Sequence, residues 1–365
     1  MAEPPSGRTT ETIVASTDEP TIEREQLSLV ARLRQPRTIA SLVVPLVLLV
    51  LVFRVALDVS VERLAAGIGQ ANGWLLVAAF VVYYLGFPLR GARWALLLRG
   101  SGFRLGTIDA TEIIFLSWLV NCLVPAKLGD LYRAWLLKFN STASLSRTFG
   151  TVFIERVLDL IAITLLGLGA GFWSFRTGLP PEIQFVAALG VAVVIGLVLG
   201  LVTLRNFGRR VIVSLRVPGR VTELYDRFEE GVFAGVGRRA LPVLGLVTVA
   251  IWATEALRLS FVVAALGFPD VSLGLSGAAF VALIGSLLTA VPLSPAGLGV
   301  VELGVVGILV TAYGVPLTEA TTIALVDRAI SVFSVIVLGS IAYAVSPKRR
   351  GAGLRLPAEA SGASP

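Results

Sequence analysis

The 365-residue chain has no histidine and a single cysteine, Cys122. The lack of histidine removes the commonest general base and metal ligand, and one cysteine can form neither an intramolecular disulfide nor a cysteine-rich zinc site. Charged residues make up only 15% of the chain, whereas soluble proteins carry roughly 25%. These absences argue against an ordinary soluble enzyme, and we expect no catalytic residue, no metal and no cofactor.

Apolar residues are instead abundant. Hydrophobic residues account for 55% of the chain, and the mean hydropathy is +0.84. This composition is typical of an integral membrane protein with several spans. The formal net charge is +7, which in a membrane protein reflects cytoplasmic loops that face anionic lipid. The chain carries no RNA-binding signature, and we expect no nucleic-acid partner.

The two ends of the chain differ from its middle. Residues 1–37 are polar, and we expect a disordered cytoplasmic tail there. Residues 38–345 hold the long apolar runs and form the predicted transmembrane domain, which begins too deep in the chain for an ordinary cleaved signal peptide. Residues 346–365 are basic and then low in complexity. We therefore expect a second disordered tail, and no soluble catalytic domain at either end.

Six stretches are apolar and long enough to cross the hydrocarbon core, which takes about 20 residues: Thr38–Leu57, Trp74–Leu89, Thr151–Phe175, Ile183–Leu204, Leu241–Leu266 and Thr321–Val345. Two further apolar regions, Ile108–Phe139 and Leu275–Tyr313, are broken in the middle by proline and glycine. Cytoplasmic loops are rich in Lys and Arg, and most basic residues fall on one side only if each broken region enters and leaves on the same side. We therefore predict an all-α polytopic bundle of about six full spans and two re-entrant helical hairpins. Both termini would be cytoplasmic, in the cell (plasma) membrane; eight simple crossings are the alternative.

The two broken regions share a short motif. The pentapeptide P-A-x-L-G occurs at Pro125–Gly129 and at Pro295–Gly299, and an acidic residue follows each, Asp130 and Glu302. Under the predicted topology, a span–hairpin–span unit then occurs twice in opposite orientation. Such an inverted repeat is typical of transporters, whose interrupted helices surround the central binding site.

The chemistry of the breaks favours an anionic ligand. Backbone groups left unpaired by proline and glycine are tolerated in a membrane only inside protein or beside a wet cavity. Half-helix N-termini carry partial positive charge, and arginine offers a planar fork for phosphate. We expect Arg93, Arg156 and Arg328 to converge on one cavity near the breaks. The predicted lipid-headgroup site comprises Arg93, Asn121, Pro125, Lys127, Gly129, Asp130, Arg156, Asp159, Pro295, Gly297, Gly299, Glu302, Asp327 and Arg328.

Several arginines also have structural explanations. Arg90 and Arg93 could snorkel to cytoplasmic headgroups from the end of their helix. Arg156 could form an internal ion pair with neighbouring carboxylates, although a charge buried near the membrane centre favours a functional role. Glu255 and Arg258 are three residues apart on one helical face, and a structural pair is the simpler explanation.

Other residues that are not arginines also have structural explanations. Glu302 could cap a half-helix or couple a proton, and we favour the cap. Lys127 and Asp130 could mark only the cytoplasmic mouth. The segment Val221–Phe233 has the pattern of an amphipathic helix on the cytoplasmic surface.

Four segments resemble the membrane region of lysylphosphatidylglycerol synthases and its stand-alone, flippase-like relatives: LRGARWALLLRG at 89–100, N-x-L-V-P-x-x-x-G-[DE] at 121–130, ERVLDL at 155–160 and PLSPAGLGVVELG at 292–304. The resemblance covers roughly residues 40–345. It implies movement of aminoacylated or other anionic or zwitterionic phospholipids, or of lipid-linked sugars, between leaflets. The sequence lacks the soluble aminoacyl-transferase domain of the full-length synthases, so we do not expect synthase activity. Some relatives pair with separate glycosyltransferases, which implies a separate transferase as a partner.

We predict a multi-pass membrane protein that binds or translocates the headgroup of a phospholipid or lipid-linked sugar between leaflets and is not an enzyme. The alternative is a membrane-embedded enzyme, or a subunit that partners a glycosyltransferase or an aminoacyl-lipid synthase. Its candidate carboxylates would be Asp130, Asp159 and Glu302. A third class is a scaffold for a partner transferase, which would tolerate substitutions in the breaks.

Overall fold

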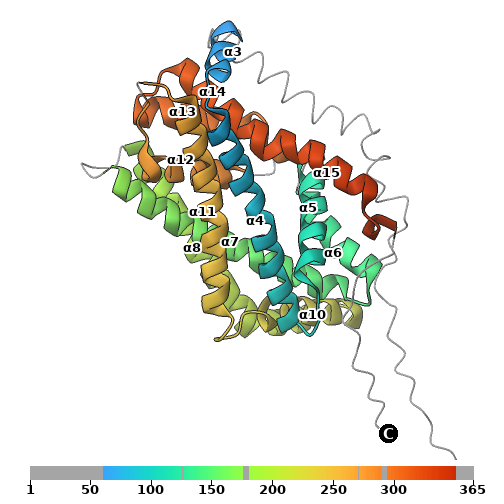
Figure 1. The fold of residues 1–365 in the computed structure, drawn as a ribbon. Coiled ribbons are helices and arrows are strands. Elements are labelled where there is room, and N and C mark those ends of the chain that lie inside the picture. The colour runs from blue at the N-terminus through green and yellow to red at the C-terminus, as the bar shows by residue number, and fades with distance from the viewer. Residues whose placement is uncertain (1–60, 125–126, 176–180, 270, 290–293, 351–365) are drawn as a thin grey trace, which may run out of the picture.

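The structure, a computed structural model, describes five ranges of the chain: 61–124, 127–175, 181–269, 271–289 and 294–350 (Figure 1). Regular structure within these ranges is helical, without strands, which confirms the all-α fold class. The first predicted span, Thr38–Leu57, and the predicted N-terminal tail lie outside the described residues, as does Pro125. The predicted number of full spans therefore stays a prediction.

The α-helices in chain order are α3 (Val61–Gly69), α4 (Gly73–Gly100), α5 (Thr107–Leu123), α6 (Leu128–Asn140), α7 (Leu145–Ser174), α8 (Pro181–Thr203), α9 (Arg209–Ser214), α10 (Gly219–Ala234), α11 (Leu241–Leu266), α12 (Gly274–Leu288), α13 (Val300–Tyr313), α14 (Leu317–Arg328) and α15 (Ser334–Val345). Short π or 3-10 segments are η3 (Leu204–Gly208), η4 (Pro295–Gly297), η5 (Ala329–Phe333) and η6 (Lys348–Arg350). Five continuous stretches of the described chain are long and apolar enough to cross a membrane: Gly73–Gly100, Ala188–Ser214, Leu241–Leu266, Pro295–Tyr313 and Leu317–Val345.

Helix α4 is longer than the sequence predicted. We expected this span to end at Leu89, but the helix continues through Arg90 and Arg93 to Gly100. The two arginines are 4% and 1% exposed, because carboxylates on neighbouring helices compensate their charges. The snorkelling explanation for both is therefore wrong, and the charges do not mark the end of the helix.

Contacts near the helix ends identify two opposite faces of the bundle. At one face the start of α7 packs against α10, where a Cβ added to Gly150 would lie 2.3 Å from the carbonyl oxygen of Phe228. At the other face the N–H of Asn72 donates to the carbonyl of Ala265 at 2.8 Å and joins the start of α4 to the end of α11. Figure 1 shows α10 at the lower end of the bundle and α3 at the upper end. We call these ends the α10 face and the α3 face.

The first hairpin, α5 and α6, opens at the α10 face, between the end of α4 and the start of α7 (Figure 1). Its tip is held by Asn121, whose Oδ1 accepts a hydrogen bond from the N–H of Gly129 at 2.8 Å. A Cβ at Gly129 would lie 2.1 Å from the carbonyl oxygen of Ser117. Only glycine therefore allows α6 to approach α5 so closely beside the predicted break.

The second hairpin, α12 with η4 and α13, opens at the α3 face, where the hydroxyl of Tyr313 lies 2.9 Å from that of Ser174 at the end of α7. Its turn contains backbone in the positive-φ region, at Ala296 (φ 51°) and Gly299 (φ 86°). The carboxylate of Glu302 accepts the N–H of Gly299 at 2.7 Å and caps the start of α13. This contact confirms the capping role that we favoured for Glu302.

The two hairpin tips meet inside the bundle. Ala296 of the second tip packs on a buried apolar cluster built largely from α4, α5 and α6. The helices that flank the first hairpin, α4 and α7, run in opposite directions to those that flank the second, α11 and α14 (Figure 1). The inverted repeat of two span–hairpin–span units stays a prediction.

The beginning of the C-terminal tail contacts the start of α5. We expected disorder from Ser346, but Lys348 is only 3% exposed and lies 2.9 Å from Asp109 at the start of α5. Its ammonium also pairs with Glu112, and its carbonyl accepts from Asn140 Nδ2 at 2.8 Å. Burial opposes the charge on Lys348, but these carboxylates outweigh it and raise the pKa of the ammonium.

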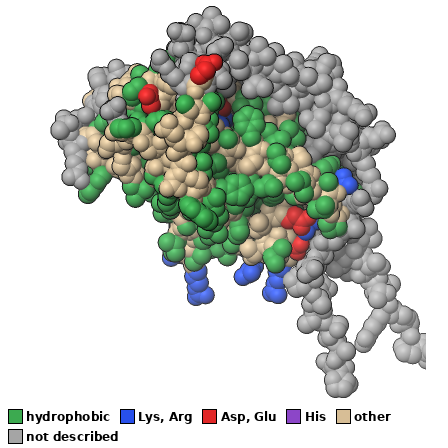
Figure 2. Space-filling model, turned by 45° about the horizontal axis from the view of Figure 1, so that its top comes forward, with side chains coloured by type: hydrophobic (Ala, Val, Ile, Leu, Met, Phe, Trp, Pro, Cys, Tyr) green, Lys and Arg blue, Asp and Glu red, His purple; other side chains and the backbone are tan. Residues whose placement is uncertain are grey.

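The surface of the molecule is largely apolar. Figure 2 shows hydrophobic side chains over much of the described surface in that view, with Lys and Arg side chains projecting from one edge. The predicted amphipathic segment Val221–Phe233 forms α10, which packs on α7. An ion pair between Arg227 and Glu223 lies on the surface of α10. An apolar surface with a basic edge is expected of a membrane protein.

Candidate functional site

A cavity of about 380 Å³ lies between the two hairpin tips. Residues of α4, α5, α6, α7, α11, α12, α13 and α14 contribute to its wall. Eight of the predicted site residues line it: Asn121, Lys127, Asp130, Arg156, Asp159, Gly297, Asp327 and Arg328. The structure therefore brings residues of both broken regions, together with Arg156 and Arg328, to one cavity.

Three arginines converge on two carboxylates of α7, Glu155 and Asp159. Arg93 binds Asp159 in a bidentate pair, with Nη1 and Nη2 donating to the two carboxylate oxygens at 2.6 and 3.1 Å. Arg133 Nη1 donates to Glu155 Oε1 at 3.1 Å. The third arginine, Arg156, lies 3.3 Å from Asp159 Oδ2. The group links α4, α6 and α7 in the interior.

Arg156 differs from the other two arginines in its accessibility. Its side chain is 32% exposed, whereas those of Arg93 and Arg133 are 1% exposed. Arg156 also lies 3.1 Å from Asp130, in the first turn of α6. Arg156 therefore presents its charge to the cavity, while Arg93 lies behind the wall and holds Asp159 in place.

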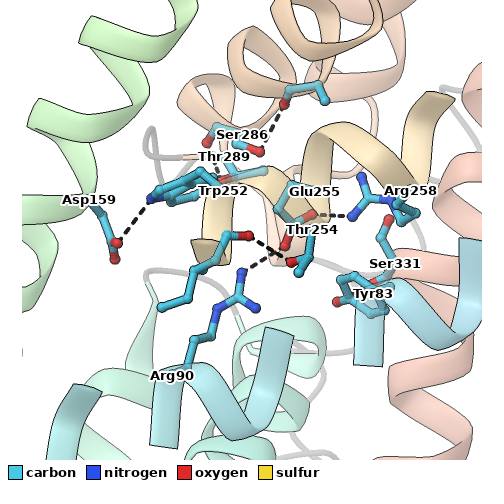
Figure 3. A network of polar contacts seen from close by, with 12 residues as sticks. Tyr83, Arg90, Asp159, Trp252, Thr254, Glu255, Arg258, Ser286, Thr289 and Ser331 are labelled. Atoms are coloured by element: carbon cyan, nitrogen blue, oxygen red, sulfur yellow. Dashed lines mark hydrogen bonds and ion pairs between the residues drawn. The ribbon is translucent and has the colours of Figure 1, made fainter. Parts of the chain in front are cut away.

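A second charged group joins α4, α11 and α14, and Figure 3 shows its members Arg90, Glu255 and Arg258. Arg90 Nη2 donates to Glu255 Oε1 at 2.7 Å, and the other oxygen of Glu255 accepts from Arg258. Arg258 in turn binds Asp327 with Nε and Nη2, at 2.8 and 3.0 Å. The pair that we expected within α11 therefore exists, but it is part of a chain of charges that reaches two further helices.

Aromatic side chains connect the groups and cover the arginines. Trp252 Nε1 donates to Asp159 Oδ1 at 3.2 Å, which links α11 to α7 (Figure 3). The guanidinium of Arg90 lies 4.7 Å from the ring centroid of Trp118. Cation–π contacts of this kind contribute about 0.5–2 kcal/mol, so the arginine side chains are held in fixed positions.

The second break is tied to the cavity by Arg328. Its Nε donates to Glu302 Oε1 at 2.8 Å, and its Nη2 donates to the carbonyl of Ala296 at 2.5 Å. The π segment η5 begins at the next residue, and the hydroxyl of Tyr83 donates to the carbonyl of Ser331 within it at 2.9 Å. π segments inside helices are frequent at functional sites because they redirect side chains.

Five predicted site residues do not line the cavity. These are Arg93, Gly129, Pro295, Gly299 and Glu302. Three of them contact residues that do line it: Arg93 binds Asp159, Gly129 donates to Asn121, and Glu302 accepts from Arg328. The expected convergence therefore holds for Arg156 and Arg328 but not for Arg93, because the bidentate pair with Asp159 occupies its guanidinium.

The half-helix N-termini also differ from the expectation. We predicted that their amides would face an anion, but the N–H of Gly129 is bound by Asn121 and that of Gly299 by Glu302. Positive charge in the cavity therefore comes from side chains. Within the described ranges, no three acidic or cysteine side chains are placed together to hold a metal ion.

Five members of the charged groups were not among the predicted site residues. We explained Arg90 by snorkelling and Glu255 with Arg258 by local pairing, yet all three line the cavity. Arg133 and Glu155 were not singled out as site residues from the sequence, but both side chains are 1% exposed, and the guanidinium of Arg133 lies 4.9 Å from the ring centroid of Trp94. One feature of the sequence could have identified them. Ionisable residues inside several apolar segments indicate a functional site, because charges in a membrane span are costly.

Comparisons with known proteins agree with these features. The family described as lysylphosphatidylglycerol synthase TM region matches residues 38–339. A UPF0104 membrane protein of Methanocaldococcus jannaschii is 35% identical over 226 residues, which cover 61% of this chain and 92% of the relative. Another, of Methanothermobacter thermautotrophicus, is 27% identical over 287 residues, covering 73% and 82% of the two chains.

One relative bears the name of an enzyme. Glycosyltransferase AglD of Haloferax volcanii is 29% identical over 298 residues, which cover 72% of this chain but only 47% of AglD. The match therefore spans about half of that protein. Since the family match extends over most of the chain and the helices are long and apolar, this multi-pass membrane protein belongs to the lysylphosphatidylglycerol synthase TM region family.

Proposed function

We propose that this protein is a lipid transporter of the flippase type, which binds the headgroup of a phospholipid or lipid-linked sugar between the two hairpin tips and moves it between leaflets. The observation that carries this proposal is the charged cavity of about 380 Å³ where hairpins from opposite faces meet. In this account the chain binds and moves the lipid and catalyses no reaction.

The hairpins are proposed to be re-entrant, with the α10 face in the cytoplasm of the cell. Exposed arginines gather near the α10 face, among them Arg99, Arg104, Arg210, Arg238 and Arg239. Cytoplasmic loops carry an excess of Lys and Arg. The first hairpin would then enter from the cytoplasm and the second from the exterior, with both termini inside and the protein in the plasma membrane.

The buried charges favour a binding role over a purely structural one. Burying an ion pair is often no better for stability than burying apolar side chains of the same volume. Helices α4, α6, α7, α11 and α14 nevertheless all contribute charged residues at the depth of the cavity. Arg156, with a 32% exposed side chain, is the arginine placed to bind a phosphate oxygen.

The opposed hairpins suggest how a headgroup could cross. One hairpin opens at each face, and both tips contact the cavity. In transporters with inverted repeats, alternating access arises when one repeat moves against the other around a fixed central site. Movement of either hairpin tip would open the cavity to one leaflet at a time, while the lipid chains stay in the bilayer.

Lipid retention by the purified full-length protein tests the binding step. Each charge-assisted contact contributes about 1.5–3 kcal/mol, so Arg156→Gln should weaken retention of a phospholipid by about ten- to a hundredfold. Native mass spectrometry measures the fraction of protein that carries lipid. The matched control is Arg104→Gln, an exposed arginine in the loop between α4 and α5, which should retain lipid as the wild type does. Equal retention by both variants would contradict the proposal.

A second candidate function is favoured by the match to AglD, a protein named as a glycosyltransferase. In that account the chain is a membrane-embedded enzyme or a subunit that presents a lipid-linked substrate to a separate transferase, with Asp130 and Asp159 as its candidate carboxylates. Turnover of a lipid–sugar donor by the purified protein would support the enzyme. Transfer that appears only after a transferase is added would support the subunit.

A further inference from the structure

The charges around the cavity balance within the described residues. Six arginines and six carboxylates lie at or directly behind its wall, and each has at least one ion-pair partner from the opposite set. The arginines are Arg90, Arg93, Arg133, Arg156, Arg258 and Arg328, and the carboxylates are Asp130, Glu155, Asp159, Glu255, Glu302 and Asp327. Their formal charges cancel.

Lys127 is the charge that remains. It lines the cavity at the tip of the first hairpin and interacts electrostatically with Arg156, Asp130 and Asp159. No carboxylate of the described residues lies within ion-pair distance of its ammonium. Asp130 is near in sequence but pairs with Arg156 and Arg133. The set around the cavity therefore carries one net positive charge, located beside the accessible Arg156.

The backbone of Lys127 is also unusual. Its φ of 51° and ψ of 36° are in the left-handed region, which costs a residue with a Cβ roughly 1–2 kcal/mol. The matching position of the second hairpin, two residues before the final glycine of P-A-x-L-G, is Gly297, also with positive φ (71°). Glycine would adopt this conformation in the first hairpin without strain. Non-glycine residues held in this region cluster at functional sites.

We propose that the cavity selects a lipid headgroup with one net negative charge, a phosphodiester without a compensating amine, and that Lys127 is the residue that sets this selectivity. The inference rests on the function proposed above. A buried charge is tolerated when an opposite charge compensates it, and a monoanionic headgroup brings the set to neutrality. A zwitterionic headgroup leaves the positive charge uncompensated, and a cationic headgroup adds to it. Arg156 and Lys127 together would hold the phosphate oxygens.

Competition among lipids with identical acyl chains tests this selectivity. The purified full-length protein is equilibrated in neutral detergent with phosphatidylglycerol, phosphatidylcholine and lysylphosphatidylglycerol, whose headgroups carry net charges of about −1, 0 and +1. Native mass spectrometry then gives the bound ratio. We expect the wild type to favour phosphatidylglycerol over phosphatidylcholine by about tenfold or more, as one charge-assisted contact allows. A polyprenyl phosphosugar, also a monoanionic phosphodiester, and water-soluble glycerophosphoglycerol distinguish the possible sources of the same headgroup chemistry.

Variants of Lys127 test whether this residue is the source of the headgroup preference. Lys127→Met should remove the preference for phosphatidylglycerol, and Lys127→Glu should reverse it in favour of lysylphosphatidylglycerol. Lys127→Arg should keep it. Arg104→Met, the loss of an exposed positive charge elsewhere, should leave the preference unchanged. Loss of the preference in Arg104→Met to the same extent as in Lys127→Met would show that net charge alone acts, and would overturn the proposal.

The wild-type protein alone also provides a test, so a variant that fails to fold does not prevent it. Wild-type retention that is independent of headgroup charge, or that favours phosphatidylcholine, would overturn the selectivity and leave lipid binding intact. Retention of no lipid by the wild type would overturn the proposed function as well. A Lys127→Met protein that folds and keeps the preference would exclude Lys127 as its source.

Discussion

The ion pair between Glu302 and Arg328 is expected to hold the second hairpin tip in place. Its N–O distance is 2.8 Å, and the side chains are 1% and 9% exposed. Removal of one partner from a buried pair leaves an uncompensated charge, at a cost of about 3–5 kcal/mol. Glu302→Gln keeps an oxygen that can accept from the N–H of Gly299, so the helix cap is preserved and the measured loss reports the ion pair.

Unfolding in mixed detergent micelles measures this effect. We expect Glu302→Gln and Arg328→Gln each to lower the free energy of unfolding by about 3 kcal/mol. The double variant should cost less than the sum by about 2 kcal/mol, because neither charge is then left alone. Arg328→Lys should recover only part of the loss, since one ammonium cannot reproduce the two-pronged contact of Arg328 with Glu302 and the carbonyl of Ala296.

An exposed ion pair provides the matched control. Glu223 on α10 pairs with Arg227, and their side chains are 53% and 26% exposed. Such pairs contribute at most about 1 kcal/mol, so Glu223→Gln should change stability little. Two results would refute the reasoning: single variants at the Glu302–Arg328 pair that unfold within about 0.5 kcal/mol of the wild type, or effects that add fully in the double variant.

Three further predictions concern topology and packing. A cysteine introduced at exposed Ser272 should react with an impermeant maleimide added to intact cells, whereas one at exposed Thr142 should react only after lysis; the reverse pattern would invert the topology. In a thermal unfolding assay, Gly129→Ala should destabilise the protein by about 2 kcal/mol or more, because the new Cβ would clash with the backbone. The control Gly169→Ala, with open space around its Cβ, should be neutral or slightly stabilising. Lys348→Gln should expose the C-terminal segment to proteolysis, because the ion pairs to the start of α5 are lost; an unchanged cleavage rate would show that other contacts hold it.

The helices and their breaks were accessible from the sequence. A span is predicted from the mean hydropathy of about 20 residues, so a few polar residues do not hide it. Proline and glycine within such a stretch indicate where the helix is interrupted. The errors occurred where tertiary contacts override a local signal. The expected end of α4 at Leu89 was wrong because Arg90 and Arg93 meet carboxylates that are distant in the sequence, Glu255 and Asp159.

The charged groups show the limit of local reasoning most clearly. Single residues beside the cavity could be predicted because the P-A-x-L-G motif occurs at both breaks, with an acidic residue after each. Their partners could not, since Arg258 pairs with Asp327 across 69 positions and Arg328 with Glu302 across 26. Arg93 lies behind the cavity wall, whereas Arg156 faces the cavity. This difference depends on three-dimensional packing and cannot be read from the spacing of residues in the sequence.

Lipid translocation by the reconstituted protein tests the proposed movement of lipid between leaflets. Proteoliposomes with a headgroup-labelled phosphatidylglycerol in both leaflets are treated with an impermeant quencher, and the fraction of label that becomes accessible over time is measured. The account predicts that wild-type protein and Arg104→Gln move the label to the outer leaflet and that Arg156→Gln slows this movement about tenfold or more. Movement at the rate of protein-free liposomes, for this lipid and for a labelled polyprenyl phosphosugar alike, would contradict the account.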